Sequence, residues 1–142
     1  MLTEDQIKLV KKKMQVNRRF KKRVHWFQLG QRRCHCCGVQ LNWAQNFNNS
    51  ATVEHMVPTS KGGTFHDENI LITCFSCNNK RGNTDWIEYV TKNNFPKSDW
   101  LIKKYLTAVE FYRTKNKKVH GSIFHKVRGY NNKIKKQQKL AA

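Results

Sequence analysis

The chain has 142 residues, of which 38% are hydrophobic, and its formal net charge is +19. This length is enough for one modest core and excludes two independent ones. A core this small is expected to need an additional stabilising link, such as a bound metal or a disulfide. The excess of Lys and Arg predicts a polyanionic partner, and nucleic acid fits better than a membrane surface.

The sequence shows no sign of a membrane or secretory protein. It has no apolar run of transmembrane length, and its start, Met1 to Asp5, lacks the basic and apolar profile of a signal peptide. We therefore expect a cytoplasmic protein with no membrane partner, whose cysteines are reduced thiols and so more typical of metal ligands than of disulfides.

The charge is distributed unevenly along the chain. Residues 1–33 contain eleven basic and two acidic residues, residues 34–96 contain four and five, and residues 97–142 contain thirteen and two. This division predicts three parts: a basic N-terminal helical arm at 1–33, a near-neutral core at 34–96, and a C-terminal helix with a basic, DNA-contacting tail at 97–142.

The first predicted element is a helix through about Val24. Thr3 and Gln6 have the spacing of a capping box, which marks a helix start. The apolar positions, such as Ile7 and Val10, are sparse among many Lys and Arg residues. We therefore expect this helix to dock only lightly.

The central part predicts short elements. Strands are expected at 39–43, at 51–57, where Pro58 prevents continuation, and at 69–72. One helix is expected to begin near Cys77. A second is expected to be capped by Thr84 or Asp85 and to run to about Lys92.

The clearest predicted helix covers 99–113, with Ser98 as its cap. Its apolar residues recur at helical spacing and predict a face buried in the core, namely Leu101, Tyr105, Ala108, Val109 and Tyr112. Beyond Lys115 the tail contains too little apolar surface to fold alone, which favours an arm that contacts DNA.

Four cysteines form two Cys-x-x-Cys pairs, Cys34/Cys37 and Cys74/Cys77. Each pair places two thiolates on one tight turn, and two pairs complete a tetrahedral zinc site with no position left for water. The sequence therefore predicts structural Zn²⁺ that clamps the intervening segment. The fifth cysteine, Cys36, is expected to be a bystander of this site. His35 is expected to support the site or to be exposed rather than to act as a ligand, and coincidental buried thiols are the alternative to zinc.

A second group of polar residues lies between and just after these cysteines. It consists of Glu54-His55-x-x-Pro58-x-Ser60-Lys61-Gly62-Gly63, then Asn69-Ile70-Leu71, then Asn78-x-x-Arg81-Gly82 directly after Cys77. Over about residues 30–82 this arrangement resembles the HNH endonuclease family, in its variety with four cysteines. The resemblance implies an α+β fold with a ββα-metal (His-Me finger) core stapled by zinc.

The resemblance also implies roles for individual residues. His55 is expected to act as the general base that activates water, Glu54 and Asn78 to bind a catalytic Mg²⁺ or Mn²⁺, and Asn69 to hold the hairpin and orient His55. In a regular strand, however, Glu54 and His55 would face opposite sides, so both can reach one site only where the strand ends or bulges. Asn78 supplies a neutral oxygen ligand, which suits a hard cation.

Basic residues are the candidates for nucleic-acid contacts. Lys61 and Arg81 are expected near the scissile phosphate, and the arms supply Arg18, Arg19, Arg23, Arg113 and Arg128. Contacts of this kind position a duplex and make binding sensitive to salt. Three further histidines, His66, His120 and His125, are expected to be surface residues.

The favoured function is a metal-dependent HNH endonuclease that hydrolyses phosphodiester bonds in DNA. By resemblance it is similar to the small free-standing nucleases of phages, including homing-like ones, in a bacterial or phage-infected cytoplasm. Two alternatives stay open: a nuclease subunit of a restriction, defence or packaging assembly with a protein partner, and a zinc-stapled nucleic-acid-binding module without catalysis. The oligomeric state and the target sequence are left open.

Overall fold

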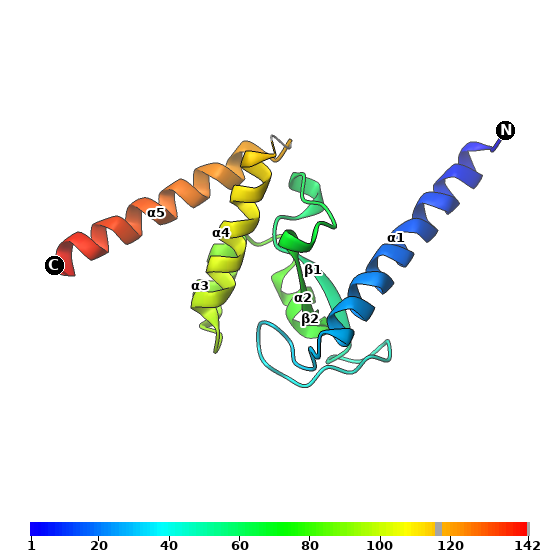
Figure 1. Ribbon diagram of the computed structural model, residues 1–142, viewed down its shortest axis with the longest axis horizontal. Helices are drawn as coiled ribbons and strands as arrows, with labels where there is room; N and C mark the ends of the chain where they lie inside the picture. Colours follow the sequence, from blue (N-terminus) through cyan, green and yellow to red (C-terminus); the bar gives the residue numbers. More distant parts are fainter. Residues whose placement is uncertain (116–117, 142) are drawn as a thin grey trace. The chain divides into compact units, whose positions relative to one another are not determined.

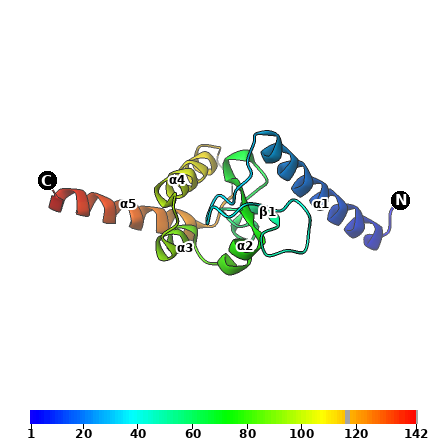
Figure 2. The ribbon, with the colours of Figure 1, turned by 90° about the horizontal axis from the view of Figure 1, so that it is seen from below.

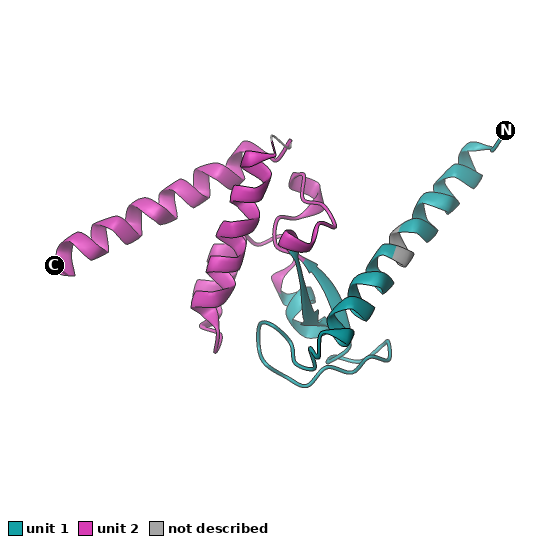
Figure 3. Cartoon of the chain, viewed as in Figure 1, with its two compact units in different colours: residues 1–54, 70–80 teal, residues 55–69, 81–142 magenta. Residues whose placement is uncertain are grey.

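A computed structural model describes residues 1–115 and 118–141; the side chains of residues 15–17 are outside the description. The chain divides into two compact units (Figure 3). The first unit contains residues 1–54 and 70–80, and the second contains residues 55–69 and 81–142. The structure has the expected α+β content, with helices and one two-stranded sheet.

In the first unit, helix α1 (Glu4–Gln28) begins at the predicted capping box (Figure 1). The backbone amide of Gln6 donates to Thr3 Oγ1 at 3.2 Å, and the amide of Thr3 donates to Gln6 Oε1 at 2.8 Å. The described side chains of the helix are exposed as far as residue 21. Its last turns pack against the rest of the first unit, where Trp26 lies edge-on to His35 with ring centroids 4.7 Å apart.

Strands β1 (Ala51–His55) and β2 (Ile70–Cys74) form an antiparallel pair. The hydroxyl of Thr52 donates to the carbonyl of Thr73 at 2.9 Å, and all five residues of β2 are buried. The predicted strand at 39–43 is wrong. That segment makes two isolated bridges, Gln40 to Arg33 and Asn42 to Ser50, and neither extends into a ladder.

Helix α2 (Phe75–Arg81) follows β2 directly, so the order β1, β2, α2 is that of a ββα unit. Two short 3-10 turns, η1 (Thr59–Lys61) and η2 (Asp67–Asn69), connect the strands. The helix starts two residues before the predicted position near Cys77. As a result, the second cysteine pair spans the end of a strand and the first turn of a helix.

In the second unit, α3 (Trp86–Asn93) is capped by Asp85, whose carboxylate accepts from the amide of Glu88 at 3.3 Å. Helix α4 (Ser98–Thr114) buries the whole predicted stripe, namely Leu101, Tyr105, Ala108, Val109 and Tyr112. The predicted Ser98 cap is wrong. Ser98 is the first helical residue, and its hydroxyl instead donates to the carbonyl of Phe95 at 3.0 Å.

The C-terminal tail, which was expected to contain too little apolar surface to fold alone, forms a helix, α5 (Gly121–Ala141) (Figure 2). Ile123 and Val127 are buried, and Tyr130 and Ile134 are half-buried at the same helical spacing. This narrow stripe docks one side of the helix within the second unit. From residue 135 onward the described side chains are exposed.

None of the helices in the described part of the chain combines the length and the apolar character that crossing a bilayer requires.

Candidate functional site

The four predicted zinc ligands come together in the first unit. The Sγ atoms of Cys34, Cys37, Cys74 and Cys77 all lie within 4.8 Å of one another. This closeness fits one tetrahedral ion bound by four thiolates. The donor set is soft and complete, so it suits a structural Zn²⁺ and leaves no coordination position for water.

The thiols of this cluster already interact strongly. Hydrogen bonds from Cys36 and Cys77 hold the pKa of Cys34 well below its usual range. Burial raises the pKa of Cys74 to about 11. A bound cation would displace the protons of these thiols, because cysteine binds a metal as the thiolate.

His35 and Cys36 are not ligands in this cluster, but both are buried beside it. The amide of Ile72 donates to Nδ1 of His35 at 2.9 Å, and the amide of His35 donates to the carbonyl of Ile72 at 3.0 Å. The turn that carries the first cysteine pair is thus fixed to β2. Of the two expectations for His35, the structure therefore favours a supporting residue over an exposed one.

Asn78 lies one residue beyond the last cysteine, on α2. Its Nδ2 donates to the hydroxyl of Thr52 at 3.1 Å and to the carbonyl of Val53 at 3.2 Å. The carbonyl of Val53 belongs to the peptide bond that precedes Glu54. These bonds fix Asn78 beside the backbone of Glu54 within the first unit. Both bonds use the amide nitrogen, and among the described residues no hydrogen bond uses the amide oxygen.

Glu54 and His55 are consecutive residues at the end of β1, and they are only 5% and 9% exposed. His55 is the last residue of the strand, so the strict alternation of a regular strand stops there. In the second unit the His55 ring lies edge-on to Phe65, with ring centroids 4.4 Å apart. Phe65 is thus a neighbour of the predicted base that the sequence did not indicate.

Asn69 is fully buried and holds the chain just after His55. The amide of Val57 donates to its Oδ1 at 2.8 Å, and its Nδ2 donates to the carbonyls of Val57 and Thr64 at 2.9 and 3.1 Å. The backbone of the loop passes close by: a Cβ at Gly63 would lie 1.7 Å from the Val57 carbonyl oxygen. Only glycine fits at that position.

Arg81 is 3% exposed and also binds this segment. Its Nη1 donates to the carbonyl of His55, its Nη2 to that of Met56 and its Nε to that of Thr84, each at 2.7 Å. The guanidinium was expected to contact phosphate. In the structure, these three bonds give it a supporting role on the backbone of the predicted base.

The other candidate nucleic-acid contacts are spread over both units. Arg18 and Arg19 are exposed on α1, and Arg23 is half-buried there. In the second unit Arg128 is exposed on α5, whereas Arg113 lies 2.5 Å from Glu110 in an exposed ion pair. Lys61 donates to the hydroxyl of Ser122 at 3.0 Å.

Comparison with known families identifies the central segment. Residues 34–84 match the family model of the HNH endonuclease, and the four clustered cysteines lie within this segment, as in the zinc-bracketed variety of that family. The match contains the cysteine cluster and all four residues of the predicted catalytic site. The chain matches no curated protein and no solved structure.

The residues of the first unit fit a second, harder cation. Glu54 offers a carboxylate and Asn78 an amide oxygen, and oxygen donors of this kind suit Mg²⁺ or Mn²⁺. The Nδ2 bonds of Asn78 fix which end of its amide faces the protein. By donor type alone, the four thiols suit zinc, whereas these two oxygen donors would suit a harder cation.

Proposed function

We propose that this chain is a metal-dependent DNA endonuclease of the HNH type. The observation that carries the proposal is that three side chains, Asn78, Arg81 and Asn69, all bind one continuous stretch, residues 52–57. Asn78 binds it at residues 52 and 53, Arg81 at 55 and 56, and Asn69 at 57. Glu54 and His55 lie in the middle of this stretch.

His55 is the general base of the proposed reaction. A neutral imidazole accepts a proton from water, and the resulting hydroxide attacks the phosphorus of a phosphodiester. Low exposure of the ring reduces competition from bulk water, while Phe65 restricts its orientation. Breaking the bond to the 3′ oxygen leaves a 5′ phosphate and a 3′ hydroxyl as products.

Glu54 and Asn78 would hold the divalent cation of this site. When bound, such a cation stabilises the negative charge that develops on the scissile phosphate and on the leaving oxygen. Asn69 and Arg81 act on the backbone rather than on the substrate. They keep residues 55–57 in one conformation. A catalytic group that is already positioned lowers the entropic part of the activation barrier.

Helices α1 and α5 supply the binding of DNA. Helix α1 contains nine Lys or Arg residues and α5 contains six, and α5 has no acidic residue. Exposed cations at this density neutralise phosphates of either strand and carry little sequence information by themselves. This arrangement favours tight, salt-dependent binding that positions the HNH domain on the duplex.

A plasmid assay tests the proposal. Supercoiled DNA incubated with the protein and Mg²⁺ or Mn²⁺ should be nicked or linearised, and a chelator should stop the reaction. Mapping of the ends should find 5′ phosphates. If DNA binds but no metal supports cleavage, a binding module or a subunit that needs a partner explains the chain better.

A further inference from the structure

A small cavity in the second unit lies beside the segment that carries His55. Its volume is about 80 Å³, and residues of the loop after β1, of segment 81–85, of α4 and of α5 line it. Pro58 and Arg81 are among them. Since Arg81 binds the carbonyls of His55 and Met56, one side chain connects the cavity wall to the backbone of the predicted base.

The lining of this cavity carries a surplus of positive charge. Lys61, Arg81 and Lys126 contribute cations, whereas Asp85 contributes the single carboxylate. Asp85 is also partly occupied as the cap of α3. Cations gathered around a recess with low-dielectric walls attract anions more strongly than the same charges on an open surface.

The start of α5 adds to the positive electrostatic potential in the cavity. Ser122, in the first turn of α5, lines the cavity, and its hydroxyl accepts from Lys61 Nζ at 3.0 Å. The amide of Ser122 donates to His120 Nδ1 at 3.2 Å, which fixes this end of the helix. A helix N-terminus presents partial positive charge to whatever lies in front of it.

One buried group in the wall lacks a partner. Tyr105 lines the cavity and is fully buried, and among the residues that the structure describes its hydroxyl has no hydrogen-bond partner. Burial, with a smaller contribution from Asp85, raises the pKa of this phenol. The hydroxyl therefore stays protonated and is a donor that needs an acceptor.

We propose that this cavity binds a phosphate group of the nucleic-acid substrate, held by Lys61, Lys126, Ser122 and Tyr105. The inference rests on the proposed function and adds a second phosphate position to it, next to the scissile one. A volume of about 80 Å³ has room for a tetrahedral anion. The phosphate could belong to an internal phosphodiester or to a 5′ terminus, because both present non-bridging oxygens.

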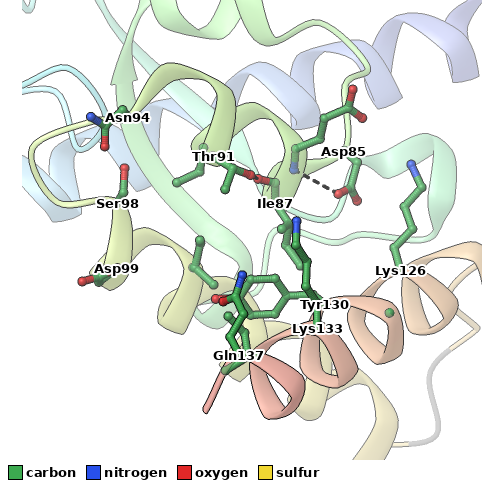
Figure 4. A pocket seen from close by; sticks show the side chains of 15 residues that line it. Asp85, Ile87, Thr91, Asn94, Ser98, Asp99, Lys126, Tyr130, Lys133 and Gln137 are labelled. Atoms are coloured by element: carbon green, nitrogen blue, oxygen red, sulfur yellow. Dashed lines mark hydrogen bonds between the residues drawn. The ribbon is translucent and has the colours of Figure 1, made fainter. Parts of the chain in front are cut away.

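A second, larger pocket of about 560 Å³ borders the same helix (Figure 4). Its lining mixes Asp85, Glu88 and Asp99 with Lys126 and Lys133, so it lacks the surplus of cations. Lys133 lines this pocket and not the small cavity, and it projects from α5 as Lys126 does. Lys133→Gln is therefore a matched control for Lys126→Gln.

The first experiment titrates the protein with inorganic phosphate at constant ionic strength and follows amide chemical shifts. Saturable shifts are expected at Tyr105 and Ser122. Lys126→Gln should weaken binding about tenfold and Tyr105→Phe several-fold, as expected for hydrogen bonds to a charged ligand, while Lys133→Gln should stay within about twofold. Shifts that do not saturate, or equal weakening in the two lysine variants, would overturn the proposal.

The second experiment identifies the source of the phosphate. In the His55→Ala background, which removes cleavage but not the cavity, short duplexes with and without 5′ phosphates compete against inorganic phosphate. Equal displacement indicates an internal phosphodiester, and displacement by the phosphorylated duplex alone indicates a terminus. If neither displaces phosphate, the cavity is not a nucleic-acid site, whether or not the wild-type protein cleaves DNA.

Discussion

The side-chain amide of Asn69 binds both sides of residue 57: the amide of Val57 donates to Oδ1 at 2.8 Å, and Nδ2 donates to the Val57 carbonyl at 2.9 Å. This pairing imitates one rung of a β-ladder, two residues after His55. The chain can therefore leave the sheet toward the loop without losing the hydrogen bonds that fix the end of β1.

Asn69→Ala should lower both stability and activity. The substitution leaves the buried polar groups of Val57 without their partner, so we expect a decrease of about 2–4 kcal/mol in the free energy of unfolding. Urea denaturation followed by far-UV circular dichroism measures it. Asn79→Ala, at an exposed position on α2, is the control and should change stability by less than about 0.5 kcal/mol.

Arg81→Lys should disrupt the backbone around His55 although the charge is kept. A lysine cannot reproduce the planar fork that binds three carbonyls, so a decrease in stability on the order of 3 kcal/mol is expected. Thermal denaturation of this variant beside Lys80→Arg, a change at the exposed preceding residue, provides the comparison. Equal melting temperatures for the two variants would contradict the supporting role of Arg81.

The cysteine cluster predicts one equivalent of zinc. Cys77→Ser should abolish stoichiometric zinc and unfold the first unit, because four close thiols provide the full ligand set. Cys36→Ala removes a buried thiol of the same turn that is not a ligand, and it should retain zinc. Elemental analysis of the purified variants distinguishes them; absence of zinc from both would assign Cys36 to the site.

Zinc should also be released by acid. Burial raises the pKa of Cys74 to about 11, so its proton is held more tightly than in a free thiol and must be displaced by the metal. Apparent zinc affinity should therefore rise with pH and fall as the solution is acidified. A chromogenic chelator measures the release, and a zinc affinity independent of pH would exclude thiolate ligands.

The two basic arms, residues 1–33 and 97–142, predict how the affinity for DNA depends on salt concentration. Replacing Arg18 and Arg19 by Gln should weaken DNA binding and reduce the slope of log K against log salt by about one for each phosphate that the protein no longer neutralises. Fluorescence anisotropy at several salt concentrations measures the slope. Lys92→Gln, an exposed change on α3, should leave it unaltered; equal effects at both sites would indicate that only net charge matters.

The sequence predicted the features that depend on spacing. The two Cys-x-x-Cys pairs, the capping box at Thr3 and the buried stripe of α4 are all short-range patterns, and the structure confirms them. The roles of His35 and Arg81 depend on hydrogen bonds across 37 and 26 residues, which no local pattern records. The catalytic roles of Glu54, His55, Asn69 and Asn78 stay predictions.

Helix α5 shows what composition leaves out at the C-terminus. Its apolar residues are too few to bury a wide face, which is why the tail was not expected to fold alone. Ile123 and Val127 nevertheless fall one turn apart and are buried within the second unit. These two side chains, with the half-buried Tyr130 and Ile134, anchor one side of the helix, so its position depends on packing that composition does not record.

The most direct test of the account is the rate of DNA cleavage by His55→Ala under single-turnover conditions with Mg²⁺ or Mn²⁺. Removal of a general base should slow cleavage by about 10²–10⁴-fold, with DNA affinity and melting temperature close to those of the wild type. His66→Ala, at an exposed position near Phe65, should cleave at the wild-type rate. A His55→Ala variant that cleaves as fast as the wild type would contradict the central claim.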